Sequence, residues 1–292
     1  MLTPAIIGQI LANGASLSAI YVLIALGFTL LFGIMRVVNF AHGAFAMLGG
    51  YALYHLYGSL GLPYVLAVPA AAGIVAAAGL ALEVLVFRWF YNRLMPGMIG
   101  SLGVNLALVF SAVLIWDVYE RSIPPAFVDI VRLGGVLLPL DRLVVTGIAA
   151  FVLLLFWLLM TRTRQGLAMR AAAQDVEIAE AQGIDTIRIY RLAFFIAVFM
   201  AALAGGLYAQ TYSLSPFMGE RPLLVAFIVV ILGGMGSIPG AALGGIILGF
   251  VESILSTLYG AATSSFVSFG AVILLLVLRP WGLLGTPDTM RA

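Results

Sequence analysis

The chain has 292 residues, of which 63% are hydrophobic and only 9% are charged; soluble domains carry about 25% charged residues, so this composition indicates an integral membrane protein. All 14 basic residues are arginine, which excludes ATP hydrolysis by a Walker-type P-loop within this chain because that loop needs a lysine. The chain has no cysteine and a net charge of +2 without a dense basic face, so thiolate metal sites and a nucleic-acid partner are not expected.

The apolar runs predict an all-α bundle of eight or nine membrane-spanning helices, forming one transmembrane domain over residues 1–292. They lie at about residues 5–34, 40–60, 63–87, 99–116, 143–160, 192–212, 223–258 and 265–278. The run 223–258 is long enough for two spans. Nine spans would place the N-terminus outside, and eight would follow if one short segment does not cross. No leader with a cleavage site precedes the first run, so a cleaved signal peptide is not expected.

The connections between the runs also carry predictions. Asn39 is placed to cap the second helix. Residues 117–141 are typical of an external loop with a short turn of strand, and residues 213–222 of a short external turn. Arginine-marked span ends predict a cytoplasmic C-terminus, and the apolar runs predict a multi-pass protein surrounded by membrane lipid.

The only long polar interval, residues 161–191, contains five arginines and four acidic residues and so cannot lie in hydrocarbon. Its flanking arginines place it on the cytoplasmic side. Residues 165–182 predict one helix of about five turns, with Gly183 as its stop and Asp185 as the cap of the next helix. Several alanines replace a large apolar stripe, which would let another protein approach closely. A solvated connector on the membrane surface fits this composition equally well.

The run 223–258 is interrupted by GGMGSIPGA at residues 233–241. Glycine and proline break a helix here. Either two spans meet in a tight turn, or two half-helices meet inside the protein. The second arrangement would place the break near a solute pathway, because unwound backbone at membrane depth needs protein or water around it.

Ionisable residues inside apolar runs are candidate functional groups. Glu83 is close to Arg88, which favours a structural ion pair. Glu252 has no arginine within reach on its own helix, so it needs a partner on another helix, a proton, or contact with water. His42 at a helix start favours a neutral imidazole bonded to a carbonyl over a substrate or proton role. Asn105 and Gln210 favour hydrogen bonds between helices, and no cluster suggests catalysis or metal binding.

Three stretches together resemble the permease subunits of branched-chain amino acid ABC importers, and the first of their two permease types more than the second. These are GIMRVVNFAHG at residues 33–43, GLAMRAAAQDVEIAEAQG at residues 166–183 and LGGMGSIPGA at residues 232–241. The resemblance implies a non-catalytic chain with a second homologous permease subunit, two ATPase subunits that carry ATP and magnesium, and an external solute-binding protein. The substrates of this family include branched-chain and other amino acids, amides, urea and aromatic acids.

The resemblance also implies that residues 170–183 are a coupling helix that docks on the ATPase. The docking residues expected on this basis are Gly166, Arg170, Ala171, Ala172, Ala173, Asp175, Glu177, Ala179 and Gly183. The residues expected along the translocation pathway are Asn39, His42, Gly233, Gly234, Gly236, Ser237, Gly240 and Glu252. The rival hypothesis is a self-sufficient secondary transporter or channel for small polar solutes.

Overall fold

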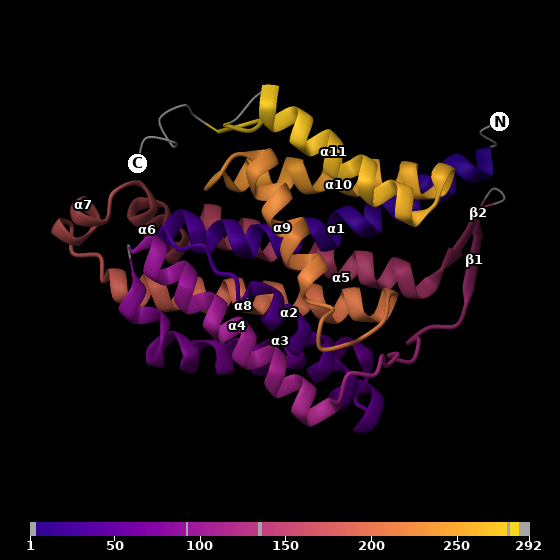
Figure 1. Ribbon diagram of the computed structural model, residues 1–292, viewed down its shortest axis with the longest axis horizontal. Coiled ribbons are helices and arrows are strands. Elements are labelled where there is room, and N and C mark those ends of the chain that lie inside the picture. Colours follow the sequence, from indigo (N-terminus) through magenta and orange to yellow (C-terminus); the bar gives the residue numbers. More distant parts are fainter. Residues whose placement is uncertain (1–3, 92, 134–135, 279–280, 286–292) are drawn as a thin grey trace.

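The computed structural model describes residues 4–91, 93–133, 136–278 and 281–285 (Figure 1). Its elements are α1 (Pro4–Met35), α2 (His42–Leu53), α3 (Tyr64–Leu85), α4 (Leu94–Trp116), β1 (Ile130–Leu133), β2 (Val136–Pro139), α5 (Leu140–Arg162), α6 (Arg164–Gln174), α7 (Val176–Ala181), α8 (Thr186–Thr211), α9 (Glu220–Gly233), α10 (Ile238–Tyr259) and α11 (Ala261–Leu278). A π-helical turn extends α2, and a 3-10 turn follows α3.

Six of the described helices, α1, α3, α4, α5, α8 and α10, are long and apolar enough to cross a membrane. This confirms the predicted polytopic membrane bundle. The helix α9 has 14 residues, fewer than the roughly 20 that a full crossing needs. The helix α2 has 12 residues and continues through six π-helical residues to Ser59. These two short helices matter for the site described below.

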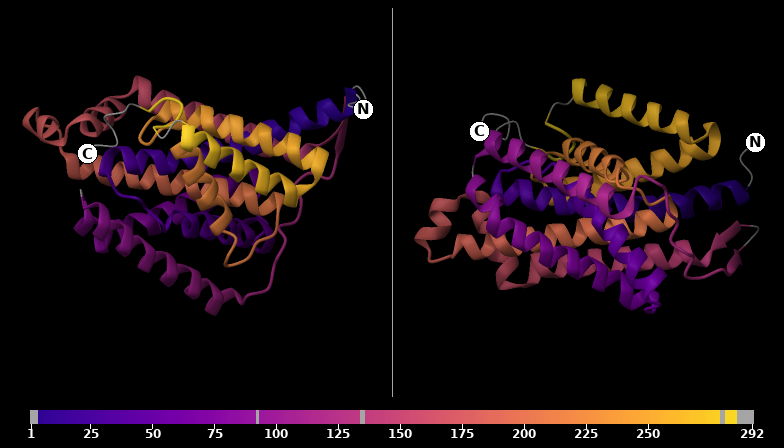
Figure 2. Two further views of the ribbon diagram at one scale, coloured as in Figure 1. Left: turned by 45° about the horizontal axis from the view of Figure 1, so that its top comes forward. Right: turned by 60° about the horizontal axis from the view of Figure 1, so that its bottom comes forward.

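The long helices lie side by side along the longest axis of the molecule, with α6 and α7 at one end and the β1–β2 hairpin at the other (Figure 1). The hairpin pairs Ile130 with Pro139 and Leu133 with Val136 in antiparallel register, which confirms the strand turn expected in the loop 117–141. Figure 2 shows α6 and α7 projecting beyond the other helices and α11 at the edge of the bundle beside α10.

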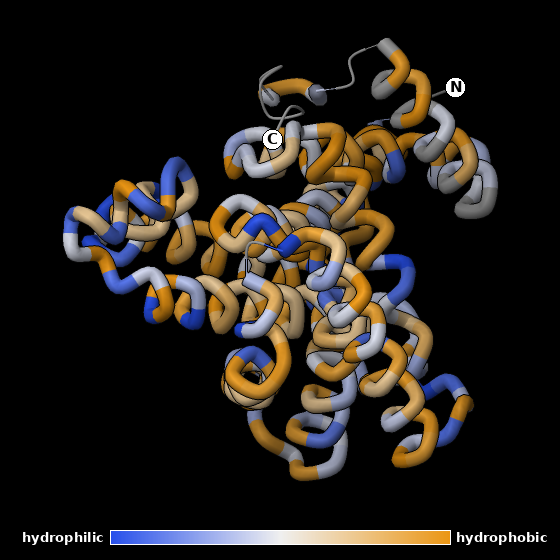
Figure 3. The backbone as a smooth tube through the Cα atoms, turned by 60° about the vertical axis from the view of Figure 1, so that its left-hand side comes forward, coloured by the Kyte–Doolittle hydropathy of each residue, from blue (hydrophilic) through white to orange (hydrophobic). Residues whose placement is uncertain are grey.

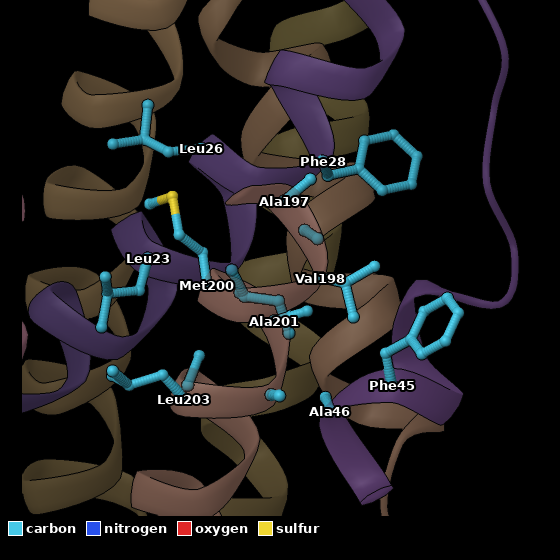
Figure 4. Close-up of a cluster of buried hydrophobic side chains, with 14 of the residues drawn as sticks. Leu23, Leu26, Phe28, Phe45, Ala46, Ala197, Val198, Met200, Ala201 and Leu203 are labelled. Atoms are coloured by element: carbon cyan, nitrogen blue, oxygen red, sulfur yellow. The ribbon is translucent and has the colours of Figure 1, made fainter. Parts of the chain in front are cut away.

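The core of the bundle is built around α1 and α8. In their most apolar stretches 83% and 78% of the residues are buried, against 11% in α4. Small residues allow close packing here: a Cβ added to Gly205 of α8 would lie 1.9 Å from the carbonyl oxygen of Ala46 in α2. Figure 4 shows this contact region, where side chains of α1, α2 and α8 interdigitate. The outer face of α4 is therefore left for lipid or another subunit.

One secondary-structure prediction is wrong. Residues 165–182 do not form a single helix of five turns but two helices, α6 and α7, that meet at Asp175. Asp175 is extended, with φ −153° and ψ 116°, and its carboxylate accepts a hydrogen bond of 3.0 Å from the amide of Ile178. Aspartate favours this capping position over a helix interior, so it ends α6 and begins α7.

Candidate functional site

The short helix α2 begins deep inside the bundle. Arg36, with φ 51°, turns the chain at the end of α1, and residues 37–41 then run back without helical structure. The imidazole Nε2 of His42, the first residue of α2, lies 3.0 Å from the carbonyl oxygen of Ile24, which is well inside α1. His42 is fully buried, so its position fits the neutral, carbonyl-bonded imidazole that the sequence favoured.

Asn39 does not cap α2 as predicted. The cap position is Ala41, which offers no side-chain hydrogen bond. The amide oxygen of Asn39 instead accepts a hydrogen bond of 3.0 Å from the backbone of Ala41 two residues on, as asparagine does in turns. The amide nitrogen of Asn39 and the Nδ1 atom of His42 are both buried without a hydrogen-bond partner among the described residues.

The second short helix, α9, begins beside α2. Gly219 precedes α9 and packs directly on Gly43: a Cβ added to Gly43 would lie 2.4 Å from the carbonyl oxygen of Gly219. From this point α2 runs toward the hairpin end, where its π-helical extension brings His55 to the indole of Trp116. The other helix, α9, runs toward the α6–α7 end. Two half-length helices therefore start together near mid-height of the bundle, and each carries partial positive charge at its start.

The prediction of a short external turn at residues 213–222 is wrong, because this segment also enters the bundle. Leu214 pairs with Arg121 in an isolated bridge and is completely buried. The chain then descends into the bundle as far as Gly219 and Arg221. Pro216 and Gly219 break the helix as expected, but the packing of Gly219 on Gly43 draws the segment inward. The composition of a polar, glycine-containing stretch does not indicate how far that stretch enters the bundle.

The glycine-rich break at residues 233–241 is a tight turn, as in the first of the two predicted alternatives, but it joins the short helix α9 to α10 and does not join two full spans. Gly234 and Gly236 have φ values of 104° and 81°, which only glycine adopts readily. Ser237 caps α10 by accepting a hydrogen bond of 3.1 Å from the amide of Gly240. A Cβ added to Gly233 would lie 2.3 Å from the carbonyl group of Gly240, so the end of α9 and the start of α10 are in backbone contact.

This turn lies at the α6–α7 end of the bundle. A cavity of about 910 Å³ is lined there by residues of both predicted groups, including Arg170 and Ala173 of α6 and Gly236 and Ser237 of the turn. The structure therefore brings part of the expected docking segment next to part of the expected pathway. Asn39, His42 and Glu252 do not line this cavity.

Glu252 finds a partner on another helix, the first of the three alternatives. One carboxylate oxygen lies 2.5 Å from Nη2 of Arg221 at the start of α9, and the other accepts a hydrogen bond of 2.6 Å from the hydroxyl of Tyr21 in α1. The carboxylate thus ties α10 to α1 and α9. A role for Glu252 along the pathway stays a prediction.

We expect Glu252→Gln to lower the stability of the protein, because the amide leaves Arg221 without its counter-charge. Breaking a buried ion pair costs about 3–5 kcal/mol. Since the Arg221 side chain is 41% exposed, water offsets part of this loss, and we expect about 1–3 kcal/mol. Thermal unfolding of detergent-solubilised protein measures it, with Glu177→Gln on the exposed face of α7 as control. An unchanged melting temperature with a slower transport rate per complex would instead place Glu252 in the pathway.

Glu83 forms a structural ion pair as predicted, but its cation is Arg191 and not Arg88. Its buried carboxylate accepts a hydrogen bond from the hydroxyl of Tyr91 and lies 3.6 Å from Nε of Arg191 at the start of α8. Arg88 instead lies over the ring of Trp89, 4.6 Å from its centroid. Among the described residues, the ion pair of Glu83 is therefore made with α8 and not with Arg88. Gln210 does bridge helices as predicted, since its amide donates a hydrogen bond of 2.7 Å to Asp141.

The segment α6–α7 is held by caps at each boundary. Thr163 accepts a hydrogen bond of 3.0 Å from the amide of Gly166, and Asp175 caps α7. Asp185 accepts a hydrogen bond of 3.1 Å from the amide of Arg188 at the start of α8, as predicted. Gly183 ends α7 with φ 84°. Figure 3 looks onto this end and shows hydrophilic residues gathered along the projecting segment.

The expected docking residues fall on two faces of this segment. Gly166, Ala172 and Ala179 are buried against the chain's own helices, and a Cβ added to Gly166 would lie 2.2 Å from the carbonyl oxygen of Leu159. These small residues therefore pack the segment against the bundle and are not accessible to another protein. The exposed face carries Arg170, Asp175, Glu177 and Gly183. It also carries two large apolar side chains that the sequence reasoning passed over, Leu167 and Ile178, which are 61% and 58% exposed.

A bundle of long apolar helices around two helices that start at mid-height, with a capped polar segment at one end, is the architecture of a polytopic membrane protein. The profile of the family described as "Branched-chain amino acid transport system / permease component" matches residues 10–278. The chain is 33% identical to the high-affinity branched-chain amino acid transport system permease protein BraD of Pseudomonas aeruginosa, over 97% of each chain. It is 32% identical to the permease protein LivH of Escherichia coli, also over 97% of each chain.

The chain belongs to the branched-chain amino acid transport permease family, and within it to the BraD and LivH type, as the resemblance predicted. It is a non-catalytic, multi-pass component of the bacterial inner membrane. The permease protein LivM of Escherichia coli is more distant, with 26% identity over 92% of this chain and 69% of its own length. No solved structure matched the chain.

Proposed function

We propose that this chain is one half of the membrane channel of an ATP-driven importer for branched-chain amino acids. The single observation that carries the proposal is the family match over residues 10–278. The LivM relative supports a second, homologous permease subunit as the other half. ATP and magnesium belong to two separate ATPase subunits, and an external binding protein delivers the amino acid.

We further propose that the exposed face of α6–α7 docks on an ATPase subunit. Leu167 and Ile178 offer the apolar contacts that interface cores need, and Arg170, Asp175 and Glu177 surround them with charge. The caps at Thr163, Asp175 and Asp185 make the segment rigid enough to transmit a movement. Its shared cavity with the α9–α10 turn gives that movement a route to the helices of the pathway.

Substrate competition tests the proposed substrate class. Cells that express the whole importer are given radiolabelled leucine with an excess of isoleucine, valine, urea or benzoate. We expect the two branched-chain amino acids to suppress leucine uptake by more than tenfold and urea and benzoate to leave it unchanged. Suppression by urea or benzoate alone, or the lack of leucine uptake above that of cells without the importer, would contradict the proposed substrate.

A further inference from the structure

A small cavity lies where the two half-length helices begin. Its volume is about 200 Å³, and it is lined by the starts of α2 and α9, the segment that leads into α9, and one face of α4. The cavity lies at mid-height of the bundle, because its wall includes Gly219, which packs on Gly43, and Asn105 at the middle of α4. It is smaller than the roughly 300–1,000 Å³ of drug-sized sites, which suits a small solute.

The cavity contains a carboxylate without a counter-charge. Glu220, the first residue of α9, lines it and is exposed. Among the described residues Glu220 has no ion pair or side-chain hydrogen bond, and the neighbouring Arg221 is engaged by Glu252. An ionised side chain at this depth is costly against lipid and is found facing water, a partner or a substrate. Because Glu220 is exposed at the start of α9, its carboxylate can meet water or a cationic group of a solute in the cavity.

The rest of the cavity supplies two further kinds of contact. The starts of α2 and α9 carry partial positive charge. The start of α9 already carries the Glu220 carboxylate, so the start of α2 is the one that favours an anionic group of the solute. Leu106, Phe110 and Leu223 provide apolar walls. A solute with only a negative charge would be repelled by Glu220, and a neutral solute would gain from neither charge. A zwitterion with an aliphatic side chain complements all three features.

We propose that Glu220 is a substrate-binding residue of the translocation pathway, accepting the ammonium group of the amino acid while its aliphatic side chain lies against the α4 wall. This inference rests on the proposed function and narrows it. Within the substrates of the family it favours amino acids over urea and aromatic acids, which lack an ammonium group. The face of α4 and α9 that carries the cavity then lines the passage between the two permease subunits.

The test uses the complete importer in proteoliposomes, with ATP inside, saturating binding protein outside and radiolabelled leucine as the probe. We expect Glu220→Gln to reduce the leucine transport rate per complex by about tenfold or more, because the amide cannot meet the ammonium group with a full charge. Glu220→Asp should restore part of the rate. Assembly with the second permease and basal ATP hydrolysis should stay unchanged, as they should in the control Glu120→Gln in the exposed loop after α4.

Each other outcome counts against the inference. An unchanged transport rate in Glu220→Gln would overturn it, and loss of the second permease subunit from the purified complex would show that Glu220 pairs with that subunit instead. A lower melting temperature with normal transport per folded complex would show that Glu220 only stabilises the start of α9. If the unaltered importer shows no ATP-dependent leucine uptake, the proposed function fails and this inference fails with it.

Discussion

Replacing Ile178 with arginine is expected to release the ATPase subunits from the complex. Ile178 is 58% exposed on α7, so arginine there does not disturb the chain's own packing but places a charge in the proposed interface. Central interface residues contribute about 2 kcal/mol or more, so we expect at least a thirtyfold loss of affinity. Co-purification of the ATPase subunits with tagged permease, followed by ATP-driven transport, measures it.

Two variants make this prediction specific. Val128→Arg introduces the same charge at an apolar residue that is still more exposed, at 84%, on the opposite end of the molecule, and should leave ATPase binding intact. Ala172→Arg is unsuitable because Ala172 is only 1% exposed, so arginine there would disrupt the seating of α6 on the bundle. Normal ATPase binding by Ile178→Arg would show that the docking surface lies elsewhere.

Replacing Gly205 with valine is expected to prevent folding of the bundle. A Cβ at this position would lie 1.9 Å from the carbonyl oxygen of Ala46 and 2.5 Å from its Cα, and backbone atoms of α2 cannot move aside as a flexible side chain could. Overpacking usually costs about 1–3 kcal/mol, but separating two core helices also exposes the surfaces around them. We expect no monodisperse protein after detergent extraction.

The matched control is Gly147→Val in α5, where a Cβ would meet nothing within 4 Å. Both changes place a β-branched residue inside a long apolar helix, so they differ only in the surrounding packing. Size-exclusion chromatography of a fluorescent fusion compares the two directly. Equal yields of folded protein would show that α2 and α8 do not pack as closely as described.

The sequence was sufficient for features that depend on local chemistry. Long apolar runs predicted the six long helices, although α2 and α9 are shorter than the spans expected from residues 40–60 and 223–258. Gly183 and Asp185 predicted the end of α7 and the start of α8 because their backbone preferences are strong. Asp175 could have been read in the same way, since aspartate is a poor residue for a helix interior. It was overlooked because the helix formers around it dominated the pattern.

The predictions that were wrong concern features that depend on contacts between distant segments. The return of the chain before α2 and before α9 is set by the packing of Gly43 on Gly219, and no local pattern encodes that contact. Treating residues 213–222 as an external turn hid both Arg221, the partner of Glu252, and Glu220. A polar Gly-Glu-Arg-Pro stretch is typical of a surface loop, so its depth becomes clear only from the structure.

The central claim is that this chain transports only as part of an ATP-driven assembly. The most direct measurement is leucine uptake into proteoliposomes that contain this chain and the second permease subunit, with and without the ATPase subunits, in the presence of the binding protein. We expect uptake only when the ATPase subunits and internal ATP are both present, and none when an ion gradient is supplied in their place. Uptake driven by an ion gradient without any ATPase subunit would contradict the account and support a secondary transporter.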